Sequence, residues 1–226
     1  MKNPWVIVGI ITVVLFGGAI WYANVSAERN NEGITITEQI KGNPEAPVVL
    51  VEYSDFQCPA CAAFQPYLAE VMAQYGDRIQ LQYKHFPLPI HASAIPAAVA
   101  AEAAGQQGKF FEYHDLLFAN QTEWSTAVAP QALFLTYAEE LGLDMDTFRR
   151  HMRSSLLRDH VRASVEEGRG LGITGTPTFF LNGQRMQVST YEDFMTQIAA
   201  AVDPGSVTVD GATTTAPAAS DIRFGL

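Results

Sequence analysis

The two cysteines of this chain, Cys58 and Cys61, are separated only by Pro59 and Ala60. They follow an apolar run and precede a segment with helical spacing. We therefore expect them one turn apart at the start of a helix, where two sulfurs can form a strained, reversible disulfide. The free N–H groups and the dipole of a helix N-terminus favour a thiolate at Cys58. Because no third cysteine is present to form a structural bridge, we predict that the pair exchanges its disulfide with other molecules.

Zinc coordination is the first alternative for this motif, because a Cys-x-x-Cys pair forms half of many zinc sites. Only His85 and His91 lie downstream at a plausible mutual spacing, and both are far from Cys61 in the sequence. We interpret these two histidines as ordinary loop residues. An inert, buried cysteine pair is the second alternative. The expectation is no metal, and no cofactor other than the redox-active disulfide between Cys58 and Cys61.

The N-terminal segment contains no charged residue between Asn3 and Ala27. An apolar run of this length can cross a bilayer, which needs ~20 residues. Trp5 and Trp21 near its two ends suit the two membrane interfaces. Lys2 precedes the run, so the positive-inside rule places the N-terminus in the cytoplasm and the rest of the chain outside. We predict that residues 1–27 are a single-pass anchor in the cell membrane.

A cleaved signal peptide is the alternative to an anchor, since Val25-Ser26-Ala27 resembles a small-residue cleavage site. The apolar region is longer than the ~7–15 residues typical of signal peptides, which favours the anchor. In either case the folded part lies outside the cytoplasm, where disulfides persist. The formal net charge of −10 would repel a polyanion, so nucleic acid is not an expected partner.

Apolar spacing and turn residues divide the rest of the chain into segments. We expect a polar spacer at 28–33, a folded domain at 34–203 and a low-complexity tail at 204–226. Strands are predicted at 34–37, 48–53, 79–83, 178–181 and 185–188, and helices at 62–75 and 191–202. The first of these helices joins two strands as a βαβ unit, so those two strands should be parallel.

The stretch from about 92 to 170 has a different character, because it is rich in Ala, Leu, Glu and Arg and has no convincing strand. Its glycine and proline breaks predict four or five helices inserted into the domain. The aromatic residues of this region are interpreted as the helical core: Phe110, Phe111, Phe118, Phe134 and Phe148.

Three motifs carry a family resemblance: residues 55–61 (Asp-Phe-Gln-Cys-Pro-Ala-Cys), 86–88 (Phe-Pro-Leu) and 175–179 (Gly-Thr-Pro-Thr-Phe). In this order and spacing, the chain resembles the DsbA-like branch of the thioredoxin fold over about residues 34 to 203. The resemblance implies an α/β thioredoxin-like fold with an inserted all-helical subdomain, here preceded by a transmembrane helix. It also implies a thiol:disulfide oxidoreductase. Many of the more oxidising relatives have His at the position of Ala60.

Under this resemblance the site residues take defined roles. Cys58 is expected to be the exposed nucleophile, because the helix N-terminus stabilises its thiolate. Cys61, one turn further, is expected to be the buried partner that completes the exchange. The resemblance implies a cis peptide bond between Thr176 and Pro177 beside the cysteines, which leaves backbone groups free to pair with a substrate chain. Without the resemblance, a trans proline at a strand start would be expected.

Two acidic residues precede the cysteines. Glu52 lies in an otherwise apolar strand, and burial there would raise its pKa and allow it to exchange a proton with Cys61. The family often has an acid at this position. The alternative is an acid at the exposed edge of the strand. Asp55 is expected to cap or orient the turn before Cys58.

The resemblance implies that the Cys58–Cys61 disulfide is transferred to cysteines of exported proteins through a mixed disulfide. It also implies a quinone-linked membrane partner that reoxidises the dithiol. A reductase or isomerase held in the dithiol state is the alternative within the class. Isomerases of this fold dimerise through a separate module, and none is visible, so a monomer is expected. Further alternatives are an enzyme dedicated to one substrate, such as a cytochrome maturation factor, and a non-catalytic, chaperone-like binder of extended chains.

Overall fold

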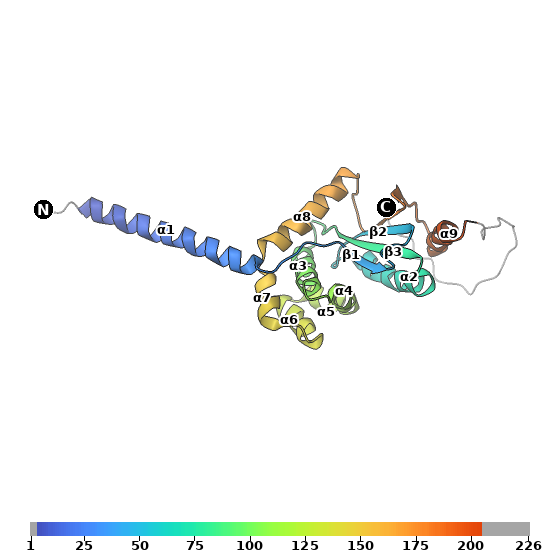
Figure 1. Ribbon diagram of the computed structural model, residues 1–226, viewed down its shortest axis with the longest axis horizontal. Helices are drawn as coiled ribbons and strands as arrows, with labels where there is room; N and C mark the ends of the chain where they lie inside the picture. Colours follow the sequence, from blue (N-terminus) through green and yellow to red (C-terminus); the bar gives the residue numbers. More distant parts are fainter. Residues whose placement is uncertain (1–3, 205–226) are drawn as a thin grey trace.

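The centre of the fold is a β-sheet with the strand order β1-β3-β2-β4-β5. The computed structural model describes residues 4–204, and Figure 1 shows the sheet beside a group of helices, with helix α1 projecting away from both. β2 and β3 are parallel, and the other neighbouring strands are antiparallel. The strands are β1 (Gln39–Gly42), β2 (Val48–Ser54), β3 (Ile79–His85), β4 (Thr178–Leu181) and β5 (Gln184–Arg185).

The helices fall into two groups according to their place in the chain. α2 connects β2 to β3 and α9 closes the domain, whereas α3 to α8 form an insertion between β3 and β4. The insertion thus contains six helices in the described part of the chain, where four or five were predicted. The helices are α1 (Pro4–Asn31), α2 (Pro59–Tyr75), α3 (Ala94–Gly105), α4 (Phe110–Ala119), α5 (Gln121–Thr126), α6 (Gln131–Glu140), α7 (Met145–His151), α8 (Ser155–Gly170) and α9 (Tyr191–Val202).

The predicted βαβ unit forms the middle of the sheet, and β2 and β3 are paired along their whole length. On one face, alternate apolar residues such as Leu50 and Leu81 pack against α2 and α9. On the other face, the Tyr53 hydroxyl donates a hydrogen bond of 2.8 Å to Glu167 on α8. Since helices cover both faces, β2 is apolar at nearly every position, as is typical of a buried parallel strand.

The helical insertion has its own core, which is continuous with the cysteine site. The alanines of α3 are buried around the helix, and α4, α6, α7 and α8 all contact it. Small side chains allow this close approach of neighbouring helices. Of the phenylalanines expected in the helical core, Phe111 is partly buried and packs against it. The others are fully inside: Phe110, Phe118, Phe134 and Phe148.

The strand predicted at residues 34–37 is wrong, because these residues are not in a strand and β1 begins at Gln39. The backbone N–H and carbonyl of Thr35 form hydrogen bonds with a side chain instead of with a neighbouring strand. Gln106 at the end of α3 accepts a hydrogen bond from the Thr35 N–H at 2.8 Å and donates one to its carbonyl at 3.1 Å. Alternation alone did not distinguish this extended segment from a strand.

The predicted spacer at residues 28–33 is also wrong, because α1 continues to Asn31 and packs against the α7–α8 corner. The Asn31 side chain accepts a hydrogen bond from the Ser154 hydroxyl at 2.7 Å and donates one to the Ser155 hydroxyl at 3.2 Å. His151 Nε2 lies 3.1 Å from the Glu32 carbonyl. The apolar helix is thus joined to the folded domain by direct contacts, and Figure 1 shows its end beside α7 and α8.

The C-terminal part of the fold follows the sequence prediction closely. Asn182 and Gly183 both have positive φ, as the turn between β4 and β5 requires. The return strand is shorter than predicted, since β5 ends at Arg185. α9 spans the predicted residues 191–202, and a Thr190–Asp193 capping box starts it. The predicted tail lies outside the described residues beyond Pro204.

Replacing Asn31 with Ala should destabilise the folded domain, because the start of α8 would lose the hydrogen bonds that tie it to α1. We expect a loss of about 1 kcal/mol in the free energy of unfolding. The measurement is chemical denaturation of the full chain in detergent micelles, with Asn24→Ala as the control at an exposed position of the same helix. Equal stability of the two variants would contradict a structural junction.

Candidate active site

The cysteine pair lies at the first turn of α2. Cys58 is the N-cap residue, and Pro59 occupies the start of the helix, where its missing N–H would have had no intrahelical partner. The Cys58 N–H donates to the Asp55 carbonyl at 3.0 Å, and the Cys58 carbonyl accepts from the Ala62 N–H at 3.2 Å. The backbone on both sides of Cys58 is therefore fixed, and its sulfur faces the N–H groups of Ala60 and Cys61.

The two thiols have very different pKa values. A hydrogen bond from Cys61 is the main cause that lowers the pKa of Cys58 to about 5, with further contributions from Thr176 and the helix N–H groups, against the opposing effect of burial. Burial is the main cause that raises the pKa of Cys61 well above its usual value, followed by the hydrogen bond and charge of Cys58 and the charge of Glu52. The dithiol form therefore holds a Cys58 thiolate and a Cys61 thiol at neutral pH.

Cys58 is less exposed than predicted: 7% of its surface is accessible, against 0% for Cys61. The cause is a pair of segments that the sequence places far away. The Gln121 side chain on α5 donates hydrogen bonds to the Phe56 carbonyl at 2.7 Å and to the Cys58 carbonyl at 2.9 Å. On the other side, the Thr176 carbonyl lies 3.5 Å from the Cys58 sulfur. Cys58 is still the more accessible of the two sulfurs.

The Thr176–Pro177 peptide bond lies beside Cys58 and is cis, as the resemblance implied. β4 begins at the next residue, Thr178, and pairs with β2 on one side. On its other side, β5 pairs only with Phe180 and Leu181. Within the described part of the chain, residues 176–178 have no strand partner on that side, so an extended substrate chain could add there.

Asp55 holds the turn before Cys58 in place. Its buried carboxylate accepts hydrogen bonds from the N–H groups of Gln57 at 2.7 Å and Leu88 at 2.8 Å, and it lies 2.6 Å from His91 Nδ1. The Gln57 side chain in turn accepts a hydrogen bond from the Ser93 N–H at 2.8 Å. These contacts connect the active-site turn to the loop after β3. His91, interpreted from the sequence as an ordinary loop residue, therefore supports the site.

The histidines considered as zinc ligands are both paired with carboxylates. His85 Nε2 lies 2.8 Å from Glu102 Oε1 in the buried interface between β3 and α3, and His91 contacts Asp55. Among the described residues, no group of three or more His, Cys, Asp and Glu side chains is placed to hold a metal ion.

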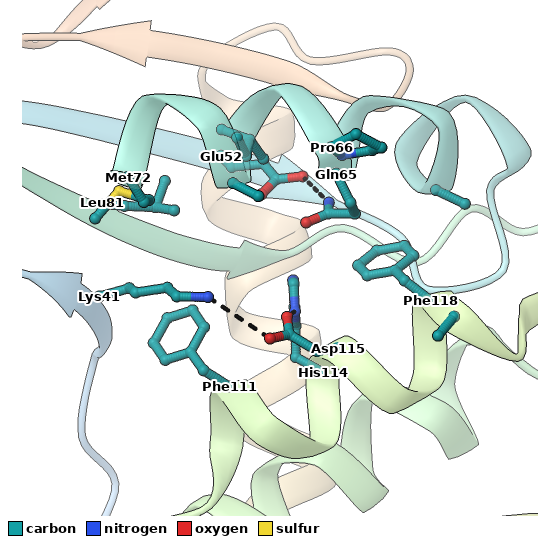
Figure 2. Close-up of a pocket in the computed structure, with 14 residues that line it drawn as sticks. Lys41, Glu52, Gln65, Pro66, Met72, Leu81, Phe111, His114, Asp115 and Phe118 are labelled. Atoms are coloured by element: carbon teal, nitrogen blue, oxygen red, sulfur yellow. Dashed lines mark hydrogen bonds and ion pairs between the residues drawn. The ribbon is translucent and has the colours of Figure 1, made fainter. Parts of the chain in front are cut away.

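Glu52 lies on β2 behind Cys61 and is 1% exposed. The alternative of an exposed edge position is wrong, because β2 lies between β3 and β4. Burial raises the pKa of Glu52 to about 7, although the nearby Ser54 hydroxyl and a hydrogen bond of 3.3 Å from the Gln65 side chain (Figure 2) act in the opposite direction. The charge of Glu52 contributes to the raised pKa of Cys61, so the protonation states of the two groups are coupled.

Sequence reasoning missed three polar residues of this site. Gln121 covers Cys58 from the helical insertion, and no local pattern could have placed it there. Ser54 and Tyr83 are buried on the same sheet face as Glu52. A signal for Ser54 was available, because it follows Glu52 by two positions in a strand whose alternate residues point inward.

Comparisons with known proteins agree with this geometry. A family model described as thioredoxin matches residues 35–200. A thioredoxin-like oxidoreductase from Silicibacter pomeroyi is 25% identical with a TM-score of 0.63, and the match covers 80% of this chain and 98% of that chain. Alpha-DsbA1 from Wolbachia pipientis is 20% identical with a TM-score of 0.67, and the match covers 78% of this chain and 96% of that chain.

A curated relative is the Na(+)/H(+) antiporter NhaA 3 of Salinispora tropica, which is 42% identical over 149 residues. The match covers 66% of this chain but only 22% of the antiporter, so the chain spans about a fifth of the length of the curated relatives it matches. The family match over most of the chain shows that the chain belongs to the thioredoxin family. The fold is similar to that of alpha-DsbA1, and the predicted thioredoxin-like α/β fold is confirmed.

Cys58 should react with iodoacetamide as a thiolate well below neutral pH. Since its pKa is lowered to about 5, the alkylation rate of the reduced protein should fall as the pH drops through about 5. Cys61 should remain unmodified up to about pH 8, because burial keeps its thiol protonated and inaccessible. Mass spectrometry of the alkylated peptides measures both rates. Equal rates for the two cysteines would contradict the assigned roles.

Proposed function

We propose that this protein is an extracytoplasmic thiol:disulfide oxidoreductase that donates the Cys58–Cys61 disulfide to cysteines of exported proteins. The observation that carries the proposal is the opposite displacement of the two thiol pKa values, down for Cys58 and up for Cys61. A stabilised Cys58 thiolate favours the dithiol form of the protein, and this makes the disulfide form a stronger oxidant. The resemblance to the DsbA-like branch supports the same direction.

The exchange proceeds in two displacements. A substrate thiolate attacks the Cys58 sulfur, the Cys58–Cys61 bond breaks, and Cys61 leaves with the electron pair and takes up a proton. A second substrate thiolate then attacks the substrate sulfur of the mixed disulfide and releases Cys58 as a thiolate. The substrate loses two electrons and two protons, the protein gains two electrons and one proton, and the second proton passes to solvent because Cys58 remains a thiolate. Glu52 is the proposed donor of the proton that Cys61 takes up, since a carboxyl with a pKa of about 7 is protonated in part at neutral pH.

Unfolded protein chains are the proposed substrates. Two strongly exposed apolar side chains, Ile90 at 81% and Val128 at 105%, lie on loops that flank the active-site turn. The loop of Ile90 is tied to that turn through Asp55, and the segment before Val128 is tied to it by the 3.4 Å hydrogen bond from the Gln57 side chain to the Ser125 carbonyl. Together with the open edge at residues 176–178, these side chains offer apolar contacts and backbone pairing to an extended chain.

The proposed location is the outer face of the cell membrane, with α1 as a single-pass anchor and its N-terminus in the cytoplasm. α1 is long and apolar enough to cross a membrane, with a span at Val8–Asn31, and the large apolar side chains described from Val8 to Tyr22 are exposed. A signal sequence can pass the same test of length and composition. The observation that favours a retained helix is the length of the apolar run, which exceeds the ~7–15 residues typical of a signal peptide. A quinone-linked membrane protein is the proposed acceptor of the electrons, and the protein is proposed to act as a monomer.

A reductase or isomerase remains the alternative direction of the same chemistry, since Ala60 supplies no imidazole between the cysteines. A binder of extended chains without catalysis is the alternative from another class. The covered sulfurs and their separated pKa values favour the enzyme, because binding alone requires neither. Antiport is not proposed for this chain, because the match to the antiporters covers only 22% of their length.

The reduction potential of the Cys58–Cys61 couple decides the direction. Equilibration with defined glutathione buffers should give a value well on the oxidising side of glutathione, and a value near about −270 mV, that of thioredoxin, would indicate a reductase. The Cys58→Ala variant should lose all oxidation of a reduced, unfolded substrate protein. The Cys61→Ala variant should instead be trapped as a mixed disulfide when its Cys58 thiolate attacks the disulfide of an oxidised substrate and releases the other substrate sulfur as a thiolate, because no second cysteine remains to resolve the bond. Full function of the doubly substituted protein would support the binder.

The full chain should remain in the membrane fraction after export and after a carbonate wash. Its catalytic domain should be digested by protease added from outside the cytoplasmic membrane. A variant that replaces residues 1–27 with a cleavable signal peptide should be soluble and should keep its exchange activity, because the cysteine site does not involve α1. A natural mature form that begins near Glu28 would overturn the anchor.

A further inference from the structure

The folded domain contacts α1 close to the end of its apolar run. Residues 8–24 of α1 are all exposed, whereas Val25 and Ser26 are half-buried. Val14, on the same helix, is 65% exposed, so the cover over Val25 comes from outside the helix. Both α7 and α8 contact α1. The helical insertion therefore reaches back along α1 to the place where its apolar run ends.

With α1 across a membrane, as proposed, its aromatic residues indicate the level of the lipid headgroups. Trp21 and Tyr22 are exposed near the end of the apolar run, and such side chains lie at the membrane interface. A helix rises about 1.5 Å per residue, so Val25 lies only about 5 Å beyond Tyr22, and Asn31 lies about 14 Å beyond it. The headgroup layer is roughly 5–8 Å thick. The part of the domain that contacts α1 thus lies at the membrane surface.

Arginines gather at this part of the domain. Between residues 149 and 162, which include the end of α7 and the start of α8, Asp159 is the only acidic residue. We call residues 149–162, together with Arg29 at the end of α1, the basic corner. Figure 1 shows the end of α1 beside α7 and α8. The arginines of the basic corner are Arg29, Arg149, Arg150, Arg153, Arg158 and Arg162.

Half of these arginines have no partner for their side chain in the described part of the chain. Arg149 lies 3.5 Å from Glu139, and Arg162 lies 3.2 Å from Asp159. Arg150 donates a hydrogen bond of 3.2 Å to the Thr147 hydroxyl. The guanidinium groups without an ion pair or a hydrogen bond among the described residues are those of Arg29, Arg153 and Arg158.

The start of α8 adds two features that suit a lipid surface. Leu156 is 44% exposed, and it directly follows Ser155, which accepts the hydrogen bond from Asn31. The N-terminus of α8 also carries the partial positive charge of the helix dipole. Basic side chains beside an exposed apolar one are typical of protein surfaces that bind at the membrane interface.

We propose that the basic corner binds the headgroups of anionic phospholipids in the leaflet from which α1 emerges. This inference rests on the proposed anchor and adds a second contact between the domain and the same membrane. A guanidinium group suits a phosphate because it donates two parallel hydrogen bonds to it. The chain has a formal net charge of −10, so an anionic bilayer attracts this corner while it repels the chain as a whole. The arginines outnumber the two carboxylates at the end of α1, which are Glu28 and Glu32.

The consequence for the exchange reaction is a more constant direction of the cysteine site. A single helix can tilt in the bilayer, and binding at the basic corner limits that tilt. α8 begins at this corner and contacts β3, and its Glu167 accepts the hydrogen bond from Tyr53 on β2. The basic corner is thus linked through α8 to the strand that leads to Cys58.

The test places the photoreactive amino acid p-benzoylphenylalanine at Leu156 in the full chain. The protein is inserted into nanodiscs of phosphatidylcholine, either alone or with about one third phosphatidylglycerol, and lipid adducts are measured by mass spectrometry after illumination. The adduct yield should be roughly threefold or more higher with phosphatidylglycerol. It should fall at about 1 M salt, where the Debye length is about 3 Å. Both leaflets of a nanodisc have the same composition, so the result does not depend on orientation.

The matched control for position is the same amino acid at Leu171, which is 50% exposed at the other end of α8. Figure 1 shows α8 extending away from the end of α1. The yield at Leu171 should therefore be low with both lipid mixtures.

The arginines are tested by Arg153→Gln combined with Arg158→Gln. This double variant should lower the yield at Leu156 in phosphatidylglycerol nanodiscs by roughly threefold to tenfold, because each arginine near an anionic surface strengthens binding by roughly fivefold. The control is Arg169→Gln combined with Arg185→Gln, which removes the same charge at exposed positions on the last turn of α8 and on β5. Both double variants should keep their disulfide exchange activity, which shows that they are folded.

Equal yields at Leu156 in the two lipid mixtures would overturn the proposal, because α1 alone would then account for the adducts. Equal yields at Leu156 and Leu171, or an equal loss in the two double variants, would do the same. Suppression by soluble glycerol phosphate at a matched concentration would indicate a phosphate site instead of a membrane surface.

The failure of this inference can be distinguished from the failure of the anchor. If the chain resists a carbonate wash but forms no adduct that depends on phosphatidylglycerol, the anchor stands and the basic corner does not bind anionic lipid. If the carbonate wash releases the full chain, the anchor fails, and this inference fails with it.

Discussion

A stable negative charge on Cys58 requires that the first turn of α2 keep its N–H groups directed at the sulfur, and three separate parts of the chain hold that turn. Asp55 ties it to the loop after β3, Gln121 holds it from the helical insertion, and Thr176 borders it just before β4. Backbone N–H groups at a helix start have no partners within the helix, so they are available to an anion. The sheet and the insertion thus converge on one sulfur, and loosening any of these contacts would weaken its thiolate.

The same turn puts Cys61 where burial has the opposite effect on its sulfur. One helical turn separates the two cysteines, yet one sulfur reaches an opening and the other faces the sheet. The neighbouring Glu52 carries a cost of its own, because raising its pKa from 4.5 to about 7 corresponds to about 3 kcal/mol of disfavoured ionisation. This cost is absent while the carboxyl is protonated in both the folded and the unfolded chain, and it is complete above the folded pKa. The proposed role of Glu52 as a proton donor to Cys61 explains why a carboxyl is kept in the core at this cost.

The helical insertion contacts two other parts of the protein, one on each of two sides. Through Gln121 it covers Cys58, and through the α7–α8 corner it receives the end of α1. Both contacts depend on the buried alanines of α3, around which the other helices pack. Because α1 enters the domain without a flexible spacer, the direction of the active site relative to α1 is set by packing.

The sequence by itself determined the features that depend on near neighbours in the chain. These include the cysteine pair at a helix start, the βαβ unit, the hairpin at Asn182-Gly183, the helix at 191–202 and the burial of Glu52 in an apolar strand. Each follows from spacing or from backbone chemistry within a few residues. The family motifs added the cis bond at Pro177.

Only the tertiary structure decided which distant groups meet. Residues 34–37 alternate like a strand but are paired by the side chain of Gln106, and the polar residues after Ala27 continue a helix because Asn31 finds partners on α8. Likewise, Tyr83 faces Glu52 only because β2 and β3 align in one register. A buried polar group must find a partner somewhere, but composition does not say where. Long-range packing determines the partner, and in this protein it brings the groups that surround the cysteine motif together.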